Sequence, residues 1–247
     1  MVDKELIIKE FKRIKSLGYI MSRRSHNTGI GKTFEDYLGV DENNDKAPDF
    51  AGFEVKSKRA ETTSFLTLFT KSPSAPKGVN AFLRDTYGEP YENNTTLKRL
   101  HTSIFANKFN SYKGKYGFKL TNDKDNERVI IEIKNLITGE IDNSTYWSYT
   151  DLDSCLSNKL KALFFVYADT KVENGVEYFH YTKAEIYRNP SLKRLLNLID
   201  EGKLMIDIRI GSYKNGKNAG KPHDHGTGFR ILPADLYSLY EDKFIVE

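Results

Sequence analysis

Cysteine is nearly absent from this sequence of 247 residues, because Cys155 is the only one. A single thiol excludes an intramolecular disulfide framework and a cysteine-rich zinc site, and it fits a reducing compartment. Long apolar runs are also missing. The longest, ALFFVYA at 162–168, is far too short to span a bilayer, and the N-terminal segment lacks the apolar core of a signal peptide. We therefore expect a soluble, cytoplasmic protein.

No charge of one sign dominates either. The chain has 38 Lys and Arg residues against 34 Asp and Glu residues, which gives a formal net charge of +4 at pH 7. This excess favours an anionic partner only weakly, since many soluble enzymes with no nucleic-acid role share it. A chain of 247 residues is long enough for one large domain or two lobes with a sizeable core.

Helical and strand patterns follow one another in a mixed order. Apolar spacing and turn residues predict helices at 3–17, around 34–38, at 79–87, from Asp151 or Asp153, from Pro190 to Gly202, and at 233–242. Alternating or continuous apolar runs predict strands at 53–58, 62–71, 98–106, 116–123, 127–136, 144–150, 161–169, 176–187 and 203–211. This order predicts an α+β fold with a mixed sheet.

Two carboxylates and a lysine gather in the stretch APDFAGFEVKSKR, residues 47–59. Gly52 permits a turn that brings Asp49 near Glu54. Magnesium prefers carboxylates supplemented by water and substrate phosphate, and a cation such as Lys56 near an attacking water favours hydroxide. The pattern therefore suits hydrolysis of a phosphodiester, although a salt bridge on a solvated strand face explains the same residues.

Strand geometry assigns the two faces of this stretch. Because side chains alternate along a strand, Phe53 and Val55 are expected to face the core, while Glu54 and Lys56 share the surface. A second predicted strand, 62–71, follows directly, so the two strands are expected to form a hairpin.

A third carboxylate lies on the short helix just before this stretch. Phe34 and Leu38 of the segment KTFEDYLG are expected to contact the core. On such a helix Glu35 could face the same cleft as Asp49, and the alternative is an exposed helix carboxylate.

The other unusual stretch is GKPHDHGTGFR, residues 220–230. His223 and His225 lie on one side of an extended segment, and with a third ligand they would form a metal site. Alternatively these imidazoles, with Lys221 and Arg230, read base edges of DNA, because arginine bound to guanine is the commonest specific contact in the major groove. A flexible basic loop without a role is the third interpretation.

Four segments together resemble one known family. In order and spacing, NTGIGKTFEDYLG, PDFAGFEVKSKR, KLKALFFVYAD and GKPHDHGTGFR resemble the MvaI/BcnI family of type II restriction endonucleases, in the MutH-like branch of PD-(D/E)xK nucleases. The resemblance implies a PD-(D/E)xK core with two lobes that form a DNA-binding cleft. It implies a mainly catalytic lobe up to about residue 110 and a mainly DNA-recognising lobe after it.

The resemblance also implies an activity. The expected enzyme is a Mg²⁺-dependent monomer that cuts double-stranded DNA at a short pseudopalindrome of the CC-N-GG type, CCWGG, leaving 5′-phosphate ends. A cognate DNA methyltransferase is expected in the host.

Roles transfer residue by residue onto the motifs that match. Asp49 and Glu54 would bind the metal, and Lys56 would position or activate the water. Glu35 would support the metal site. The residues expected to contact DNA are Arg209, Lys221, His223, His225 and Arg230. This interpretation makes the salt bridge the minor alternative, and it leaves two others open: a MutH-like repair nicking enzyme, and a catalytically silent DNA-binding protein.

Overall fold

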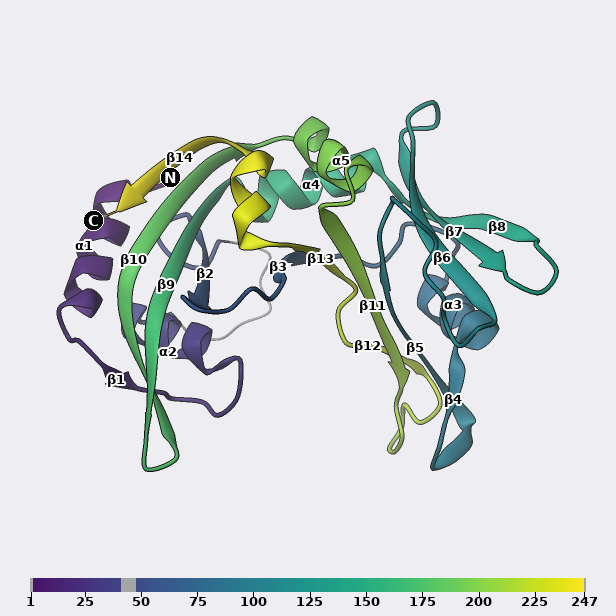
Figure 1. The fold of residues 1–247 in the computed structure, drawn as a ribbon, viewed down its shortest axis with the longest axis horizontal. Helices are drawn as coiled ribbons and strands as arrows, with labels where there is room; N and C mark the ends of the chain where they lie inside the picture. The colour runs from purple at the N-terminus through teal and green to yellow at the C-terminus, as the bar shows by residue number, and fades with distance from the viewer. Residues whose placement is uncertain (1, 41–47, 247) are drawn as a thin grey trace. The chain divides into compact units, whose positions relative to one another are not determined.

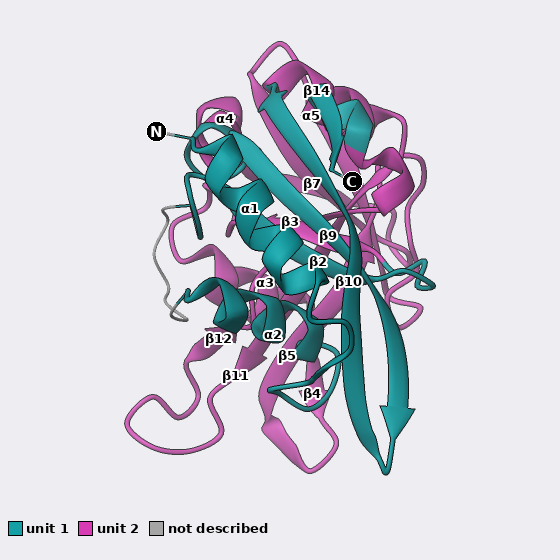
Figure 2. Cartoon of the chain, turned by 90° about the vertical axis from the view of Figure 1, so that its left-hand side faces the viewer, with its two compact units in different colours: residues 1–64, 156–191, 237–247 teal, residues 65–155, 192–236 magenta. Residues whose placement is uncertain are grey.

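The computed structural model describes residues 2–40 and 48–246, and contacts between segments distant in sequence divide the chain into two units (Figure 2). Unit 1 comprises Met1–Ser64, Leu156–Ser191 and Tyr237–Glu247, and unit 2 comprises Phe65–Cys155 and Leu192–Leu236. The sequence predicts a single division at about residue 110, whereas the chain passes between the units four times. The reason is that strands from both halves of the chain pair within unit 1.

Unit 1 is built on a five-stranded sheet with the order β1-β10-β9-β2, in which β14 also pairs with β10 (Figure 1). The elements of this unit are α1 (Lys4–Lys15), β1 (Ile20–Met21), α2 (Gly29–Leu38), β2 (Glu54–Arg59), β9 (Ala162–Glu173), β10 (Val176–Pro190) and β14 (Tyr240–Val246). Strand β2 runs parallel to β9, and the other pairs are antiparallel.

Both helices of unit 1 pack against this sheet through aromatic side chains. Phe11 of α1, Phe34 of α2 and Phe53 all contact the ring of Phe164 on β9, with centroid separations of 5.8, 6.4 and 6.2 Å. Phe53 and Val55 are both buried in this core, which confirms the face predicted for them. Burying each such side chain contributes about 1.5–3 kcal/mol to folding stability. Because Phe53 directly precedes β2, its burial holds the start of this strand against the core.

The predicted hairpin between residues 53–58 and 62–71 is wrong. Strand β2 pairs with β9, and β3 (Leu66–Thr70) pairs with β13 (Gly228–Ile231) in another sheet. Both partners lie more than a hundred residues further along the chain, where local pattern carries no information about pairing. The mixed sheet that results agrees with the predicted α+β class.

Unit 2 contains two sheets. One has the order β3-β13-β11-β5-β4, with β12 also paired to β11, and the other is the antiparallel meander β6-β7-β8 expected from the middle of the sequence. The remaining elements are α3 (Val79–Tyr87), β4 (Glu89–Tyr91), β5 (Asn94–Ile104), β6 (Tyr116–Asp123), β7 (Arg128–Asn135), β8 (Ile141–Ser148), α5 (Leu192–Asp200), β11 (Leu204–Ser212) and β12 (Pro222–Asp224).

Two elements span the limits of the units in sequence, α4 (Tyr149–Lys159) and the 3₁₀ helix η1 (Pro233–Leu239). The helix predicted over 233–242 is therefore shorter, because from Tyr240 onward the chain pairs with β10 as the edge strand β14. The short strands β1, β4 and β12 are likewise not predicted, since each is formed by pairing with a longer neighbour. In the part of the chain that is described, no helix combines the length and apolar character needed to cross a membrane.

Candidate functional site

A tight turn places Asp49 at the start of β2. Phe50 and Phe53 pair through backbone hydrogen bonds of 3.1 and 2.8 Å, and both central residues, Ala51 and Gly52, have positive φ angles of 50° and 81°. The turn brings Oδ2 of Asp49 to 2.8 Å from the backbone nitrogen of Val55, which donates to it. The predicted approach of Asp49 to the strand is therefore present.

Glu54 departs from the prediction, because it is only 2 % exposed. Its Oε1 accepts a hydrogen bond from Nζ of Lys56 at 2.6 Å, and Nζ of Lys159 lies 3.7 Å from the same oxygen. The side of β2 opposite Phe53 is therefore covered. The ion pair of Glu54 and Lys56, which was expected on the surface, has a buried carboxylate. Tyr240 is also buried, and the negative charge of Glu54 helps to raise the pKa of its phenol.

Burial raises the pKa of Glu54, the nearby Lys56 lowers it, and the charge of Asp49 raises it again. The second oxygen, Oε2, is buried and has no hydrogen-bond partner among the described residues. It is one of eight buried side-chain atoms without a partner among the described residues, and it is the only carboxylate oxygen of the eight. A carboxylate that is short of donors and repelled by a second carboxylate suits a divalent cation, which would satisfy the oxygen and offset both negative charges.

The donor set matches the needs of magnesium more closely than those of a fully protein-ligated metal. No group of three or more His, Cys, Asp or Glu side chains within residues 2–40 and 48–246 is arranged to hold an ion. Magnesium commonly uses one or two carboxylates and fills its remaining positions with water and phosphate oxygens, so Asp49 and Glu54 suffice as protein ligands. Glu35 is half-buried on α2 and does not join them in a group of three, so its supporting role stays a prediction.

Lys159 is a site residue that sequence reasoning missed. It ends α4, ahead of β9, and approaches Glu54 because Leu163 of β9 pairs in parallel with Glu54. The signal was available only in the segment KLKALFFVYAD, which begins at Lys159 and supports the family resemblance.

The predicted DNA-contacting residues lie in unit 2, where two arginines share one buried carboxylate. Nε of Arg209 and Nη1 of Arg230 lie 2.7 and 3.2 Å from Oδ2 of Asp207, a residue only 5 % exposed. Burial lowers the pKa of Arg230, whose Nε has no hydrogen-bond partner among the described residues. Asp207 was missed, although an acidic residue inside the apolar strand LMIDIRIG is a visible irregularity.

Four aromatic rings line up beside these arginines. The ring of His223 stacks on Tyr213 with centroids 4.2 Å apart and lies 4.1 Å from the ring of His225, which contacts His101 edge-on at 6.2 Å. The backbone nitrogen of His225 donates to the carbonyl of Arg209 at 2.9 Å. The structure therefore brings His223, His225, Arg209 and Arg230 together. Sequence reasoning missed His101 and Tyr213.

Lys221 meets this cluster through its backbone, because its carbonyl accepts from the backbone nitrogen of Tyr213 at 3.0 Å. Its ammonium donates to Oδ1 of Asn218 at 3.2 Å within the exposed turn that precedes β12. The alternative histidine metal site receives no support, since no third ligand group forms around His223 and His225 among the residues described.

Asp224 holds the histidine-bearing segment in place. Its Oδ1 accepts from the backbone nitrogens of Gly226 and Thr227 at 2.8 and 3.0 Å. Its Oδ2 accepts from Oγ of Ser72 and Nδ2 of Asn80 at 2.9 and 3.1 Å. Both oxygens of Asp224 are therefore satisfied, which favours an ordered conformation for residues 222–227 over a flexible loop.

The side chains on this face define an open hollow. Its lining combines donors and acceptors from His101, Thr102, Ser103, Asp207, Arg209 and His225. The pKa of His101 is lowered by burial and by the neighbouring His225, Arg99 and Arg209. A neutral imidazole presents one donor and one acceptor, which suits contacts with the mixed groups of base edges.

Comparisons with known proteins show which family the chain resembles. The family model described as the MvaI/BcnI restriction endonuclease family matches residues 8–240. A solved complex of restriction endonuclease MvaI with its cognate DNA substrate has 36% sequence identity and a TM-score of 0.89, with 100% of both chains covered. MvaI solved in the absence of DNA has the same identity and a TM-score of 0.67, with 100% of this chain and 99% of that chain covered. No curated protein sequence matches.

Proposed function

This chain belongs to the MvaI/BcnI family and is a type II restriction endonuclease, and from that premise we propose that it hydrolyses double-stranded DNA with Mg²⁺ at CCWGG. This is a short pseudopalindromic site of the CC-N-GG type, and the products carry 5′-phosphate ends. The observation that carries the catalytic part is the orphaned, buried Oε2 of Glu54 between Asp49 and Lys56. The observation that supports the DNA partner is the cognate DNA bound to MvaI.

In the proposed site Asp49 and Glu54 hold the magnesium ion. When bound, magnesium acts as a Lewis acid, which lowers the pKa of water and offsets negative charge on the phosphoryl oxygens. Lys56 fixes the orientation of the Glu54 carboxylate through its 2.6 Å contact. Its ammonium also offsets the negative charge that develops as a water oxygen bonds to phosphorus and the 3′ oxygen leaves. Glu35 is proposed to orient the metal site from α2.

Recognition is assigned to the other unit. Arg209, Arg230, His223 and His225 are proposed to read base edges, and Lys221 to contact DNA nearby. Asp207 fixes the fork of each arginine before DNA arrives, which reduces the entropy lost on binding. All of these residues belong to unit 2, whereas Asp49, Glu54 and Lys56 belong to unit 1. This separation supports a division into catalytic and recognition lobes.

The remaining parts of the proposal follow from the resemblance. The enzyme acts as a monomer in the cytoplasm, where a cognate methyltransferase protects the host DNA. A nicking enzyme of the MutH type would require partner proteins for full activity, which a single-chain restriction enzyme does not.

Incubation of the purified protein with plasmid DNA and Mg²⁺ tests the function directly. Discrete fragments whose ends map by run-off sequencing to CCWGG are expected, and omission of Mg²⁺ should stop the reaction. Nicking that appears only with added partner proteins would identify the MutH-like alternative. Binding without any cut by the wild-type protein would show that the carboxylates are structural.

A further inference from the structure

The face that carries the histidines and arginines continues beyond them along β5 and β11. Arg209 pairs with His101 and Ile210 pairs with Leu100 across these strands. Leu100 and Ile210 are fully buried, so the alternate positions lie on the opposite, open face. Arg99, two residues from His101, and Gly211, two residues from Arg209, belong to that open face.

On this face Gly211 lies between His225 and Tyr91. A Cβ atom at Gly211 would lie 3.0 Å from Nε2 of His225 and 2.8 Å from Oη of Tyr91. The phenol oxygen also accepts from the backbone nitrogen of Ser212 at 3.3 Å. Tyr91 is therefore an immediate neighbour of the proposed base-reading histidine, and the missing side chain of Gly211 makes room for both.

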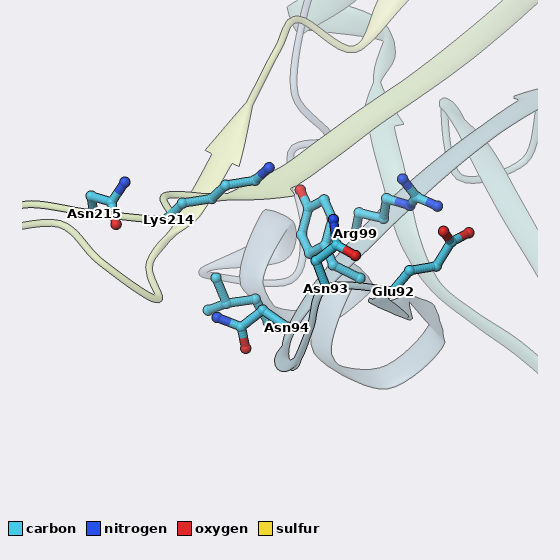
Figure 3. A pocket seen from close by; sticks show the side chains of 8 residues that line it. Glu92, Asn93, Asn94, Arg99, Lys214 and Asn215 are labelled. Atoms are coloured by element: carbon cyan, nitrogen blue, oxygen red, sulfur yellow. The ribbon is translucent and has the colours of Figure 1, made fainter.

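Beyond Tyr91 lies a second open hollow, between the β4–β5 hairpin and the loop after β11 (Figure 3). The guanidinium of Arg99 and the ammonium of Lys214 each lie 5.3 Å from the centre of the Tyr91 ring. Arg99 also pairs with Glu89 at 3.2 Å. Lys214 forms no ion pair within the described part of the chain, so its ammonium is available to a ligand in the hollow.

The other lining groups are mostly amides. Asn93 lies in the turn of the hairpin and Asn94 begins β5. Oδ1 of Asn94 accepts from Thr96, which leaves its amide nitrogen as a donor. Glu92 is the carboxylate among the lining residues. Two cations and three amides, the third from Asn215, lie around an aromatic ring and match a tetrahedral, multiply accepting anion more closely than an apolar ligand.

We propose that this hollow binds a phosphodiester group of the DNA backbone flanking the target bases. The proposal rests on the proposed function, because continuity with the base-reading face identifies DNA as the source of the phosphate. Contacts to phosphate carry no sequence information and position the protein on the duplex. Lys214, Arg99 and the hairpin amides thus set the register in which His225 meets its base.

Two substitutions with opposite expected effects on DNA affinity test this site. Lys214→Gln removes the unpaired cation and should weaken duplex binding about two- to five-fold for target and scrambled sequences alike. It should also lower the slope of log affinity against log salt by about one. Glu92→Gln removes the repelling carboxylate and should strengthen binding by a similar factor. Lys108→Gln, the same charge change at an exposed lysine outside the hollow, should leave affinity within about two-fold.

Duplex length separates a flanking phosphate from a base contact. Affinities are measured by fluorescence anisotropy in Ca²⁺ on duplexes trimmed one base pair at a time from both ends. The effect of Lys214→Gln should vanish once the contacted flank is removed, while the wild-type protein still binds. An effect that persists on the shortest bound duplex would overturn the flanking assignment.

Two further results separate this inference from the proposed function. If Lys214→Gln and Glu92→Gln bind as the wild-type protein does on long duplexes, the phosphate site is wrong while the nuclease assignment stands. If the wild-type protein binds no duplex at all, the proposed function itself is wrong. Unchanged circular dichroism and melting temperature are required of each variant, which is expected because both substituted side chains are exposed.

Discussion

Nζ of Lys56 lies 2.6 Å from Oε1 of Glu54, while Oε2 of the same carboxylate is buried without a hydrogen-bond partner among the described residues. One oxygen is thus held by the chain and the other is left for a ligand. An isolated structural salt bridge gains nothing from an orphaned oxygen, because an unsatisfied buried acceptor costs about 1–3 kcal/mol. The arrangement is expected where that oxygen binds a cation.

Asp49→Asn should abolish Mg²⁺-dependent cleavage, with a loss of at least about 100-fold. The asparagine oxygen can still accept from the backbone nitrogen of Val55, so the turn is preserved while the charge that attracts metal is lost. DNA binding in Ca²⁺ should stay within a few-fold of the wild-type value. Cleavage at the normal rate would remove Asp49 from the metal site.

Metal binding can also be measured without DNA. Mg²⁺ or Mn²⁺ should raise the melting temperature of the wild-type protein, since a ligand that binds only the folded state stabilises it. Neither ion should do so for Asp49→Asn. Equal stabilisation of both proteins would place the ion elsewhere.

Lys56→Gln should lower the single-turnover cleavage rate by orders of magnitude with little change in DNA affinity. Lys159→Gln is the matched control, since this ammonium lies 3.7 Å from the same carboxylate oxygen and should matter less. Rates and affinities are compared on one oligonucleotide duplex. A loss confined to affinity would make Lys56 a phosphate anchor.

Arg209→Ala and Arg230→Ala should each relax discrimination at one base pair, by roughly 1–3 kcal/mol. Arg→Lys at the same positions retains the charge and loses the planar fork, so it should relax specificity nearly as much. Competition binding with duplexes that carry single base-pair changes measures this. Arg128→Ala removes an arginine of β7 paired with Asp123 and should leave the preference unchanged.

The loss of stability on acidification should depend on Glu185, a buried carboxylate of β10. Burial pushes the pKa of Glu185 up, but hydrogen bonds from Tyr187, Lys183 and Lys243 outweigh it and lower the pKa to about 2 from 4.5. A depressed carboxyl pKa adds stability above pH 4.5, and this contribution is lost as pH falls from 4.5 to about 2.

Glu185→Gln should therefore lower the free energy of unfolding at pH 7 by on the order of 1–3 kcal/mol, with the difference shrinking below pH 4.5. Urea titrations at several pH values measure it. Glu173→Gln, at an exposed ion pair with Lys171, should change little at any pH. A difference for Glu185→Gln that does not vary with pH would contradict the assigned ionisation.

The monomer proposal predicts a reaction intermediate. One chain carries one Asp49–Glu54 pair, so a monomer must cut the two strands in turn, and nicked plasmid should accumulate before linear DNA. Sedimentation should find one protein per duplex. A dimer on the target with no nicked species would contradict this, since protein two-fold symmetry commonly mirrors DNA symmetry.

Local sequence pattern was sufficient for elements that form close neighbours in the chain. The helix α3 matches the predicted 79–87, and the meander β6-β7-β8 follows the predicted order. Pattern failed where pairing is distant, as at β2 with β9. It also failed at β12, where Pro222, His223 and Asp224 lack the apolar pattern of a strand and form one only because β11 supplies a partner.

The residue types of the candidate site could be predicted from the sequence, but the burial and the contacts of those residues could not. Spacing identified Asp49, Glu54 and Lys56, whereas the burial of Glu54 depends on distant segments such as β9, which pairs with its strand. Likewise Asp207 is recognisable as a polar residue in an apolar strand, but its link to both Arg209 and Arg230 requires the pairing of β11 with β13. The functional groups could be predicted from local sequence, whereas their burial could not.

The strand β14 protects an edge of the sheet in unit 1. It pairs Val246 with Ala184 and Tyr240 with Pro190. A chain truncated before residue 240 would leave the backbone groups of β10 between Ala184 and Pro190 without these partners. An open strand edge can pair with a second chain, so truncated variants are expected to aggregate more readily than the intact chain.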